Sequence, residues 1–208
     1  MPPSLSPTYA IIPVKPLNRA KSRLARALKA TTRAALVRSI FSRTLDVIGQ
    51  VARIDGVLVV SRDLTILELA RQRSAITLME SDSGLNPALT QAAQWAAQRH
   101  GRSVLIIPVD LPLITATDLD EIINRAAEDR CIVIVPDRHE DGTNVLLVRP
   151  PDAIQFAYGT SSFHTHRAQA LERGLVVHEY RSPATAFDID VPDDLEVYRA
   201  LDSHMLSE

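Results

Sequence analysis

The stretch SVLIIPVD at residues 103–110, followed directly by LPLI, decides the fold prediction. A continuous Val, Leu and Ile run bounded by polar residues is typical of a strand buried on both faces, as in parallel sheets covered by helices. The run ends at Asp110. Ligands of open α/β sheets bind outside the carboxyl ends of the strands, so an acid here suits a cation or a phosphate-bound metal. Alternatively, Asp110 only starts the turn before Leu111-Pro112; taken alone, the two interpretations are equally favoured.

Four further apolar runs have the same character, and helical patterns separate them. The runs are YAIIPV (9–14), GVLVV (56–60), AITLM (75–79) and CIVIV (131–135), and helices are expected over 36–48, 87–99 and 118–128. This alternation predicts a three-layer α/β fold, with a mainly parallel central sheet and helices on both faces.

The rhythm of the sequence changes after residue 135. The segments NVLLV (144–148), VVHEY (176–180) and FDID (187–190) are separated by irregular stretches that contain glycine and histidine. They predict antiparallel additions at one side of the sheet. A closing helix is expected to begin near Pro192, with Asp193 and Asp194 serving only to favour its first turn.

Length and composition frame these elements. The 208 residues, 46% hydrophobic and 23% charged, suit one domain over residues 1–208, with 1–8 as a flexible leader. A net charge of -2 without long charged blocks argues against binding nucleic acid. The one cysteine, Cys131, excludes a disulfide framework and is expected to be a buried small hydrophobe. Without a secretory leader or a membrane-length apolar run, a cytoplasmic protein that binds no membrane is expected.

A basic loop, VKPLNRAKSRLA (14–25), follows the first expected strand. It contains two of the three lysines of the chain, Lys15 and Lys21, together with Arg19 and Arg23. Such a cluster at the carboxyl end of a strand suits a polyphosphate. The loop has no glycine, so side chains and a helix N-terminus near Ser22 would have to bind the phosphates. The alternative is a solvated basic turn.

Two further acids, Asp188 and Asp190, alternate around Ile189 in FDID. In an extended segment, residues two apart point to the same side, so these two carboxylates would share a face. Together with Asp110 they could hold Mg²⁺ through oxygen ligands, the remaining positions being taken by water and substrate phosphates. Capping of the last helix is an equally good explanation for FDID by itself.

Glycines and hydroxyls gather in DGTN (141–144) and YGTSS (158–162). Glycine permits close backbone approach, and hydroxyls can donate hydrogen bonds to an anion. The pair His164 and His166 has no partners at zinc-motif spacing, so an anion contact or a surface helix start is favoured over a metal site. An ordinary turn-rich surface loop is the alternative for each half.

Six collinear segments together resemble the nucleotidyltransferases of coenzyme F420 biosynthesis, the phosphoenolpyruvate or 2-phospho-L-lactate guanylyltransferases. The segments are IIPVKPLNRAKSRLA, SDSGLNPALTQA, VLIIPVDLPLI, PDRHEDGTNVLLVRPP, YGTSSFHTH and DIDVPDDL. The resemblance implies a nucleotide-diphospho-sugar transferase fold of the glycosyltransferase-A type. It also implies dependence on Mg²⁺ and transfer of GMP from GTP to a phosphorylated three-carbon acid.

The resemblance also assigns residues to roles. The acceptor contacts would be Thr143, Gly159 and Ser162. A base-recognition turn would contain Gly84 and Asn86. The metal ligands would be Asp110, Asp188 and Asp190, and the catalytic and phosphate-facing groups would be Lys15, Lys21, Arg23 and again Asp110. An Arg- and Ala-rich, Lys-poor composition favours a bacterial member and hence phosphoenolpyruvate, with 2-phospholactate or 3-phosphoglycerate as alternatives.

Two other functions are compatible with parts of this pattern. A cytidylyl- or uridylyltransferase acting on a sugar phosphate shares the strand-end acids, but such enzymes usually open with a Gly-rich loop, and no glycine lies between Val14 and Ile48. A non-catalytic nucleotide-binding module is the second. The sequence leaves the oligomeric state open, a homodimer included.

Overall fold

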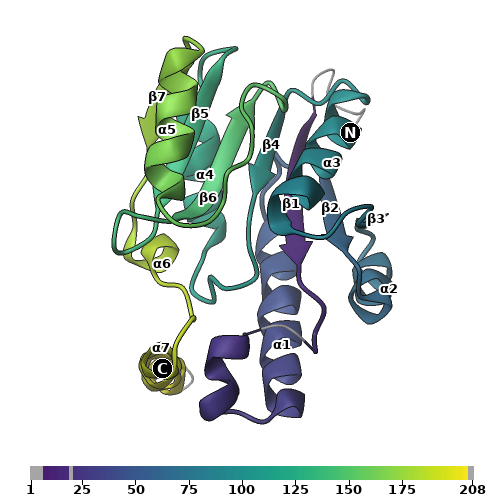
Figure 1. The fold of residues 1–208 in the computed structure, drawn as a ribbon, viewed down its shortest axis with the longest axis vertical. Coiled ribbons are helices and arrows are strands. Elements are labelled where there is room, and N and C mark those ends of the chain that lie inside the picture. The colour runs from purple at the N-terminus through teal and green to yellow at the C-terminus, as the bar shows by residue number, and fades with distance from the viewer. Residues whose placement is uncertain (1–6, 19–20, 206–208) are drawn as a thin grey trace.

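The central element is a seven-stranded sheet in the order β3-β2-β1-β4-β6-β5-β7 (Figure 1). The computed structural model describes residues 7–18 and 21–205, with side chains described as far as residue 200. The strands are β1 (Thr8–Val14), β2 (Gly56–Ser61), β3 (Ile76–Met79), β4 (Ser103–Ile106), β5 (Cys131–Pro136), β6 (Thr143–Arg149) and β7 (Val176–Glu179). All five of the apolar runs predicted first become strands, and the α/β fold class is confirmed.

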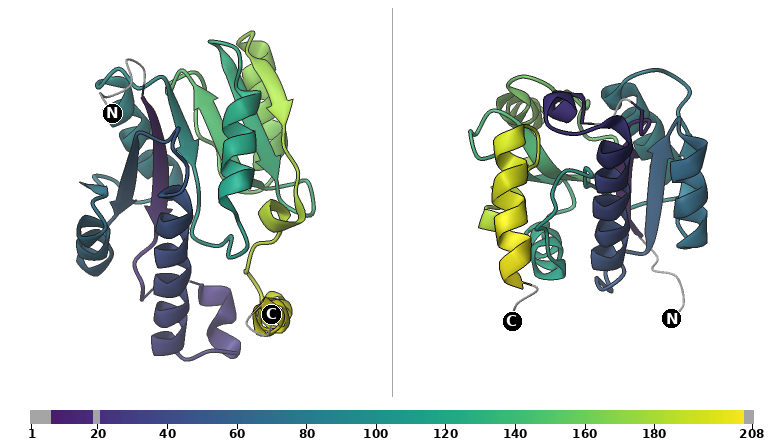
Figure 2. Two further views of the ribbon diagram at one scale, coloured as in Figure 1. Left: turned by 180° about the vertical axis from the view of Figure 1, so that it is seen from behind. Right: turned by 90° about the horizontal axis from the view of Figure 1, so that it is seen from below.

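Helices cover both faces of this sheet (Figure 2). One face carries α1 (Ala30–Ile48), α2 (Leu64–Gln72) and α4 (Ala116–Arg125), whose apolar side chains join a core that includes Phe41, Leu67 and Ile122. The other face carries α3 (Leu85–Ala97) and α5 (Ser162–Glu172), which contribute Leu89 and Phe163. Cys131 is fully buried in the first of these cores, as expected.

The remaining helices lie at the carboxyl end of β1, below the sheet in Figure 1. They are the 3₁₀ helix η1 (Ser22–Arg26), the short α6 (Pro183–Ala186) and α7 (Pro192–Met205). A small apolar cluster joins Leu24 of η1, Ile40 of α1 and Leu195 of α7 around the fully buried Ile189. This cluster anchors the C-terminal segment under the sheet.

Strand order creates a natural place for a ligand between β1 and β4. β2 and β3 extend the sheet on one side of β1 in parallel, and β4 pairs with β1 in parallel on the other side. Chain order therefore reverses between β1 and β4. Open α/β sheets bind ligands at such a switch point, outside the carboxyl ends of the strands.

Strand β4 is shorter than predicted and ends four residues before Asp110. Ile107 still donates a backbone hydrogen bond to the Ile11 carbonyl at 2.9 Å. The next residue, Pro108, has no backbone N–H and cannot continue the ladder. Asp110 therefore lies on a loop beyond the strand rather than at its last position.

The expectation of antiparallel additions at one side is correct only for β6. This strand runs antiparallel to both β4 and β5 and lies between them, inside the sheet. β7 instead pairs parallel to β5, because α5 returns the chain across the sheet before β7 begins. The segment 187–190 forms no strand; its Ile189 N–H bonds a loop carbonyl, that of Asp110, at 3.0 Å.

Two smaller differences concern the chain ends. Thr8 belongs to β1, so the leader predicted over residues 1–8 is too long, and residues 1–6 lie outside the described part of the chain. The closing helix begins at Pro192 as predicted. In the described part of the chain no helix has both the length and the apolar composition needed to cross a bilayer.

Replacing Thr115 by Ala tests the local design of α4. The Thr115 hydroxyl accepts from the Asp118 N–H at 3.1 Å, and the Asp118 carboxylate accepts from the Thr115 N–H at 3.0 Å, which completes a capping box. We expect Thr115→Ala to lower the free energy of unfolding in urea by about 1 kcal/mol. Thr117→Ala, an exposed position in the first turn of the same helix, is the control and should change it by less than about 0.5 kcal/mol. Equal effects of the two substitutions would contradict the capping role.

Candidate active site

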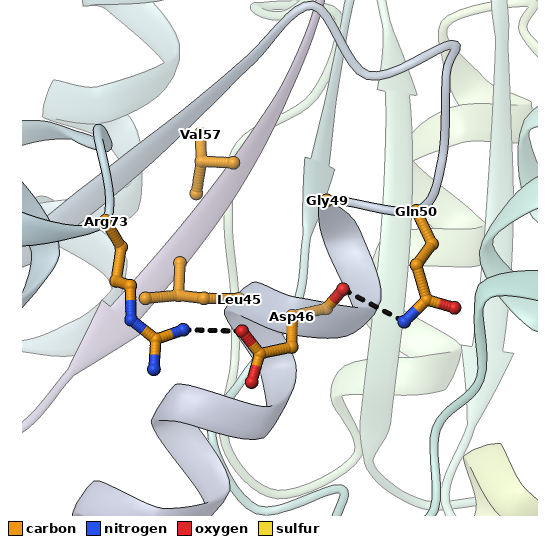
Figure 3. Close-up of a pocket in the computed structure, with 6 residues that line it drawn as sticks. All are labelled: Leu45, Asp46, Gly49, Gln50, Val57 and Arg73. Carbon is orange, nitrogen blue, oxygen red and sulfur yellow. Dashed lines mark hydrogen bonds and ion pairs between the residues drawn. The ribbon is translucent and has the colours of Figure 1, made fainter.

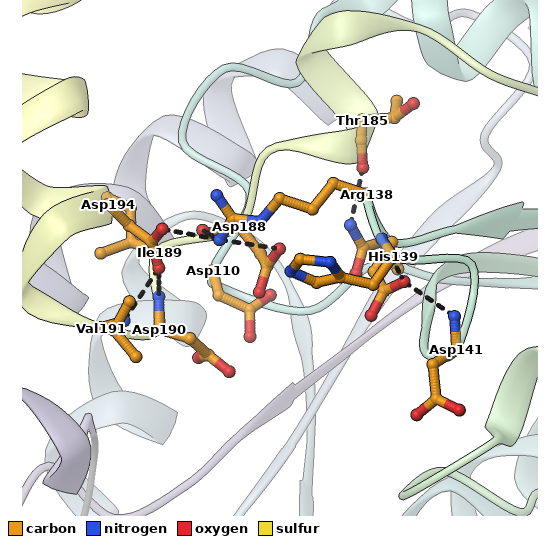
Figure 4. A network of polar contacts seen from close by, with 12 residues as sticks. Asp110, Arg138, His139, Asp141, Thr185, Asp188, Ile189, Asp190, Val191 and Asp194 are labelled. Atoms are coloured by element: carbon orange, nitrogen blue, oxygen red, sulfur yellow. Dashed lines mark hydrogen bonds and ion pairs between the residues drawn. The ribbon is translucent and has the colours of Figure 1, made fainter.

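Three predicted acidic residues meet at the switch point of the sheet (Figure 4). Asp110 lies on the loop after β4, whereas Asp188 and Asp190 lie on the segment between α6 and α7. The backbone hydrogen bond from the Ile189 N–H to the Asp110 carbonyl ties these two segments together. Residues almost eighty positions apart therefore share one small volume outside the strand ends.

The ammonium group of Lys21 lies among these carboxylates. Its Nζ is 3.6 Å from Asp110 Oδ2 and 3.4 Å from Asp190 Oδ1, and it donates a hydrogen bond to the Ile189 carbonyl. Only 9% of the side chain is exposed. Lys21 has a left-handed backbone (φ 50°) immediately before η1, a conformation that is unusual for a residue with a side chain and is common at functional sites.

The rest of the predicted basic loop contributes unevenly. Arg23 Nη1 lies 3.1 Å from Asp190 Oδ2, with 72% of its side chain exposed. Lys15 is exposed and has no hydrogen bond or ion pair with any described residue. Arg19 lies outside the described residues. The fold therefore brings Lys21 and Arg23 to the acids, while Lys15 stays free on the same loop.

The pKa of Asp188 is raised by its position in the acidic group. Burial, followed by the charges of Asp110 and Asp190, raises its pKa to about 6, and Arg138 at 3.9 Å offsets only part of this effect. Like charges that cannot be solvated raise each other's pKa in this way. A strongly perturbed carboxyl at the mouth of a sheet is a mark of a functional site.

Asp194 organises the segment that carries Asp188 and Asp190. With 4% of its side chain exposed, it accepts the N–H groups of Asp190 and Val191 at 2.8 Å each and pairs with Arg138 Nη2 at 2.6 Å. The sequence-based expectation that Asp194 only favours the first turn of α7 is therefore wrong. Its carboxylate holds the acid-bearing segment against the loop after β5.

The acidic group does not form a complete metal cage. Among the described residues, no three His, Cys, Asp or Glu side chains are arranged to hold a metal ion by themselves. The chemistry of the donors nevertheless suits Mg²⁺, which usually binds one or two carboxylates together with water and substrate phosphates.

The predicted acceptor residues lie together at the amino ends of β6 and α5. The Thr143 N–H donates to Ser162 Oγ at 2.9 Å, and the Ser162 N–H donates to the Gly159 carbonyl at 3.2 Å. Gly159 has φ 142°, which favours glycine, and a Cβ there would meet no atom within 4 Å. A turn that borders open space is thus joined to two buried hydroxyls.

His166 sets the direction of the hydrogen bonds in this turn. It is fully buried, not on the surface as expected, and burial lowers its pKa to about 4, so the ring is neutral at physiological pH. Its Nε2 accepts from the Ala157 N–H at 2.9 Å, so the proton resides on Nδ1 and is donated to Thr143 Oγ1 at 3.0 Å. Both hydroxyls, of Thr143 and Ser162, thus accept from the protein and keep a proton for another partner.

Asp141 fixes the start of α5 beside these hydroxyls. Its carboxylate accepts from the Ser161 N–H at 3.0 Å and from the Ser161 hydroxyl at 2.9 Å, and Ser161 has a left-handed φ of 55°. The Asp141 carbonyl accepts from the Phe163 N–H at 3.0 Å. These bonds hold the loop before β6 against the turn before α5.

The predicted base-recognition turn lies at the start of α3. Gly84 has φ 130° and precedes the helix. Asn86 uses its side-chain amide within the protein: Oδ1 accepts from the Tyr158 N–H at 2.8 Å, and Nδ2 donates to the Tyr158 carbonyl at 3.1 Å. The turn is therefore hydrogen-bonded to Tyr158, which precedes Gly159 of the predicted acceptor site. The role of Gly84 and Asn86 toward a base stays a prediction.

Sequence reasoning missed Asp141, Asp194, Arg138 and the role of Tyr158. In the sequence, Asp194 is only an acid shortly after Pro192, a pattern that is common at the start of helices. His166 was noticed for its HxH spacing, but nothing in that spacing indicates burial. Their functions depend on partners that lie at least eight positions away in the chain, apart from the backbone contacts of Asp194.

A shallow pocket elsewhere in the molecule does not compete with this site (Figure 3). It has a volume of about 340 Å³ and is lined by Leu45, Asp46, Gly49, Gln50, Val57 and Arg73. Val57 is the second residue of β2, so the pocket lies at the amino end of the parallel strands. Ligands of open α/β sheets bind at the opposite end.

Comparisons with solved structures bear on the fold. The fold resembles a protein from Desulfovibrio desulfuricans G20 described as a nucleotide-diphospho-sugar transferase, with a TM-score of 0.75, 16% identity, and coverage of 93% of this chain and 87% of that one. It also resembles a nucleotidyl transferase from Methanothermobacter thermautotrophicus, with a TM-score of 0.69, 15% identity, and coverage of 97% and 99%. The nucleotide-diphospho-sugar transferase fold is confirmed.

Curated relatives are considerably closer in sequence. A phosphoenolpyruvate guanylyltransferase from Sphaerobacter thermophilus is 43% identical, over 91% of both chains. A 2-phospho-L-lactate guanylyltransferase from Methanothermobacter thermautotrophicus is 37% identical, over 90% of this chain and 82% of its own length. A 3-phospho-D-glycerate guanylyltransferase from Colwellia psychrerythraea is 33% identical, over 97% and 95%.

The family described as guanylyl transferase CofC like matches residues 8–199, which include every predicted site residue. Both the match and the relatives span nearly the whole chain. The chain belongs to the CofC-like guanylyl transferase family, and it is a nucleotidyltransferase.

Proposed function

We propose that this enzyme transfers GMP from GTP to phosphoenolpyruvate, giving enolpyruvyl-diphospho-guanosine and pyrophosphate for coenzyme F420 biosynthesis. The observation that carries the proposal is family membership combined with the meeting of Lys21, Arg23 and the acidic group at the switch point. Three relatives that are 38–43% identical are named phosphoenolpyruvate guanylyltransferases. We assign the reaction to the cytoplasm, where GTP and phosphoenolpyruvate are available.

The proposed reaction is an in-line attack by a phosphate oxygen of the acceptor on the α-phosphorus of GTP. The new P–O bond forms as the bond to the leaving pyrophosphate breaks. The acceptor phosphate is already ionised, so the enzyme needs no general base. Its residues instead align two polyanions and neutralise the charge that develops on the leaving group.

Two groups of residues divide this task. Lys21, Arg23 and the free Lys15 would face the phosphates of GTP, since their loop follows β1 at the switch point. Thr143 and Ser162, each with a hydroxyl proton left over, would donate to the acceptor, and Gly159 would let its anion approach the backbone. Gly84 and Asn86 would recognise the base.

We also propose that Asp110, Asp188 and Asp190 hold Mg²⁺ together with the phosphates of GTP. When bound, Mg²⁺ would neutralise phosphate charge and help to orient the α-phosphorus. The fit is supported by the raised pKa of Asp188, because a buried carboxyl beside two others gains most from a cation. Lys21 contacts two of the same carboxylates and supplies positive charge there in the free protein.

Pyrophosphate release tests the proposed function directly. The purified protein is incubated with Mg²⁺ and GTP, and with phosphoenolpyruvate, 2-phospho-L-lactate or 3-phosphoglycerate in separate reactions. CTP and UTP replace GTP in a parallel series. We expect the highest kcat/KM for GTP with phosphoenolpyruvate; preference for another acid would change the acceptor but keep the reaction class, and no release with any pair would refute enzymatic function.

Asp110→Asn should lower kcat/KM by about 100-fold or more, because it removes a charge at the reacting phosphates while keeping the shape of the side chain. The matched control is Asp152→Asn, at an exposed position with no hydrogen bond or ion pair to the described residues. Steady-state kinetics and circular dichroism would be measured for both variants. Near-normal turnover of Asp110→Asn would remove Asp110 from the mechanism.

Lys21→Gln should raise KM for GTP and lower kcat, together costing roughly 100-fold in kcat/KM, since the pyrophosphate loses a buried cation. Lys29→Gln is the control, because Lys29 is exposed at the start of α1. The chain has three lysines, and Lys29 is the one that lies outside the predicted basic loop. The control should retain wild-type kinetics. Identical kinetics of the two variants would exclude a specific role for Lys21.

Asp188→Asn should inactivate the enzyme and yet stabilise the free protein. The folded pKa of about 6 lies above the ordinary value of 3.8, so the wild type loses stability as the pH rises from about 4 through 6. Asn does not ionise, so at pH 7.5 the variant should gain up to about 3 kcal/mol in unfolding free energy, and little near pH 4. Urea unfolding of both proteins across this pH range checks the prediction, and Asp82→Asn, at an exposed position, is the control. A gain in unfolding free energy that does not depend on pH would show that ionisation of Asp188 is not its cause.

A further inference from the structure

The hydroxyl of Tyr158 is buried and has no hydrogen-bond partner among the described residues. Two other side-chain atoms share this state, but both are the Nε of arginines, Arg33 and Arg149, whose guanidinium groups bond through Nη1. Tyr158 has no second polar atom in its side chain. A buried hydroxyl left unpaired destabilises the folded protein relative to a paired one, so this hydroxyl requires an explanation.

Tyr158 is held in place on several sides. The Asn86 amide bonds both its backbone N–H and its carbonyl. Its ring meets the His166 ring edge-on, with centroids 5.0 Å apart and an interplanar angle of 66°. The phenol also packs against the apolar core beneath α3 and α5. These contacts fix the hydroxyl in one position, which is the property expected of a preorganised donor.

Tyr158 has neighbours in both halves of the site. Burial and then the charge of Asp110 raise the pKa of Tyr158 well above its ordinary value, so the phenol is neutral and can donate. The next residue is Gly159, which borders open space. Tyr158 therefore lies within electrostatic reach of Asp110 and immediately beside the turn that carries Ser162.

Packing alone does not explain a tyrosine here. Phenylalanine would fill the same space in the core without leaving an unpaired hydroxyl. The cost of the hydroxyl is offset only if a ligand supplies its missing acceptor. The ring of Tyr158 contacts His166, which donates to Thr143, and the Thr143 and Ser162 hydroxyls each have a proton to offer. A further donor in this part of the molecule suits an oxygen-rich anion.

We propose that Tyr158 is a substrate-binding residue whose Oη donates a hydrogen bond to an anionic oxygen of the phosphorylated acid acceptor. This inference rests on the proposed function and extends it. Binding of the acceptor beside Gly159, where an added Cβ would meet no atom within 4 Å, would supply the oxygen that Oη lacks in the free protein. The hydroxyl also places a donor near Asp110, whose charge would otherwise repel the approaching acceptor.

The test compares Tyr158→Phe with Tyr180→Phe, the same chemical change at two tyrosines. Tyr180 donates its hydroxyl to Asp118 Oδ1 at 2.8 Å, and neither residue is assigned to the site, so it is the matched control. For Tyr158→Phe we expect an unchanged or raised urea midpoint, KM for the acceptor raised about 10-fold to 100-fold, and KM for GTP unchanged. For Tyr180→Phe we expect a lowered midpoint with wild-type KM values.

Several results would overturn the inference. An unchanged acceptor KM in Tyr158→Phe would show that the hydroxyl does not touch the acceptor. A lowered urea midpoint without a KM change would show that the hydroxyl has a structural partner, and a change in KM for GTP alone would place it at the nucleotide. Wild-type protein that releases no pyrophosphate with any acceptor overturns the proposed function as well, whereas active wild type with an unaffected variant overturns this inference alone.

Discussion

The contact of the Lys21 ammonium with the carboxylates of Asp110 and Asp190 is the interaction on which the site depends. It joins the loop after β1, the loop after β4 and the segment before α7. Without a cation there, three carboxylates in a poorly hydrated volume would repel one another and separate the segments that carry them. The raised pKa of Asp188 indicates that even with Lys21 present the compensation is incomplete. A further cation bound among these carboxylates would therefore stabilise their charged forms.

The other half of the site is built on a different principle, because its hydrogen-bond donors are neutral. His166 is uncharged, and its ring accepts from one backbone N–H and donates to Thr143. In this arrangement the Thr143 and Ser162 hydroxyls each accept a hydrogen bond and donate none to a described residue. A charged half that faces the nucleotide and a neutral donor half that faces the acceptor would keep two polyanions in separate places. Asn86 links both halves by fastening the start of α3 to Tyr158.

Much of the architecture could be predicted from local patterns, since a buried parallel strand has to be continuously apolar and a covering helix has to be apolar on one face. The runs at β1 to β5 therefore identified the fold class. Strand direction was harder: VVHEY looks the same whether it pairs parallel or antiparallel, and only the crossing of α5 makes β7 parallel to β5. The end of β4 was also misplaced, although Pro108 marks it, because the apolar run continues beyond the last ladder bond.

The sequence by itself determined the chemical groups of the site: the acid Asp110 that follows an apolar run, the basic loop with Lys21, and the hydroxyl-rich turns. Each is visible because it interrupts an apolar run or concentrates rare residues. Only the tertiary structure decided which of these groups meet, since a contact between Lys21 and Asp190 spans 169 positions and depends on how α7 packs against η1. Burial was likewise decided there. The neutral state of His166, the raised pKa of Asp188 and the unpaired hydroxyl of Tyr158 arise from surroundings that distant segments assemble, and no local pattern contains them.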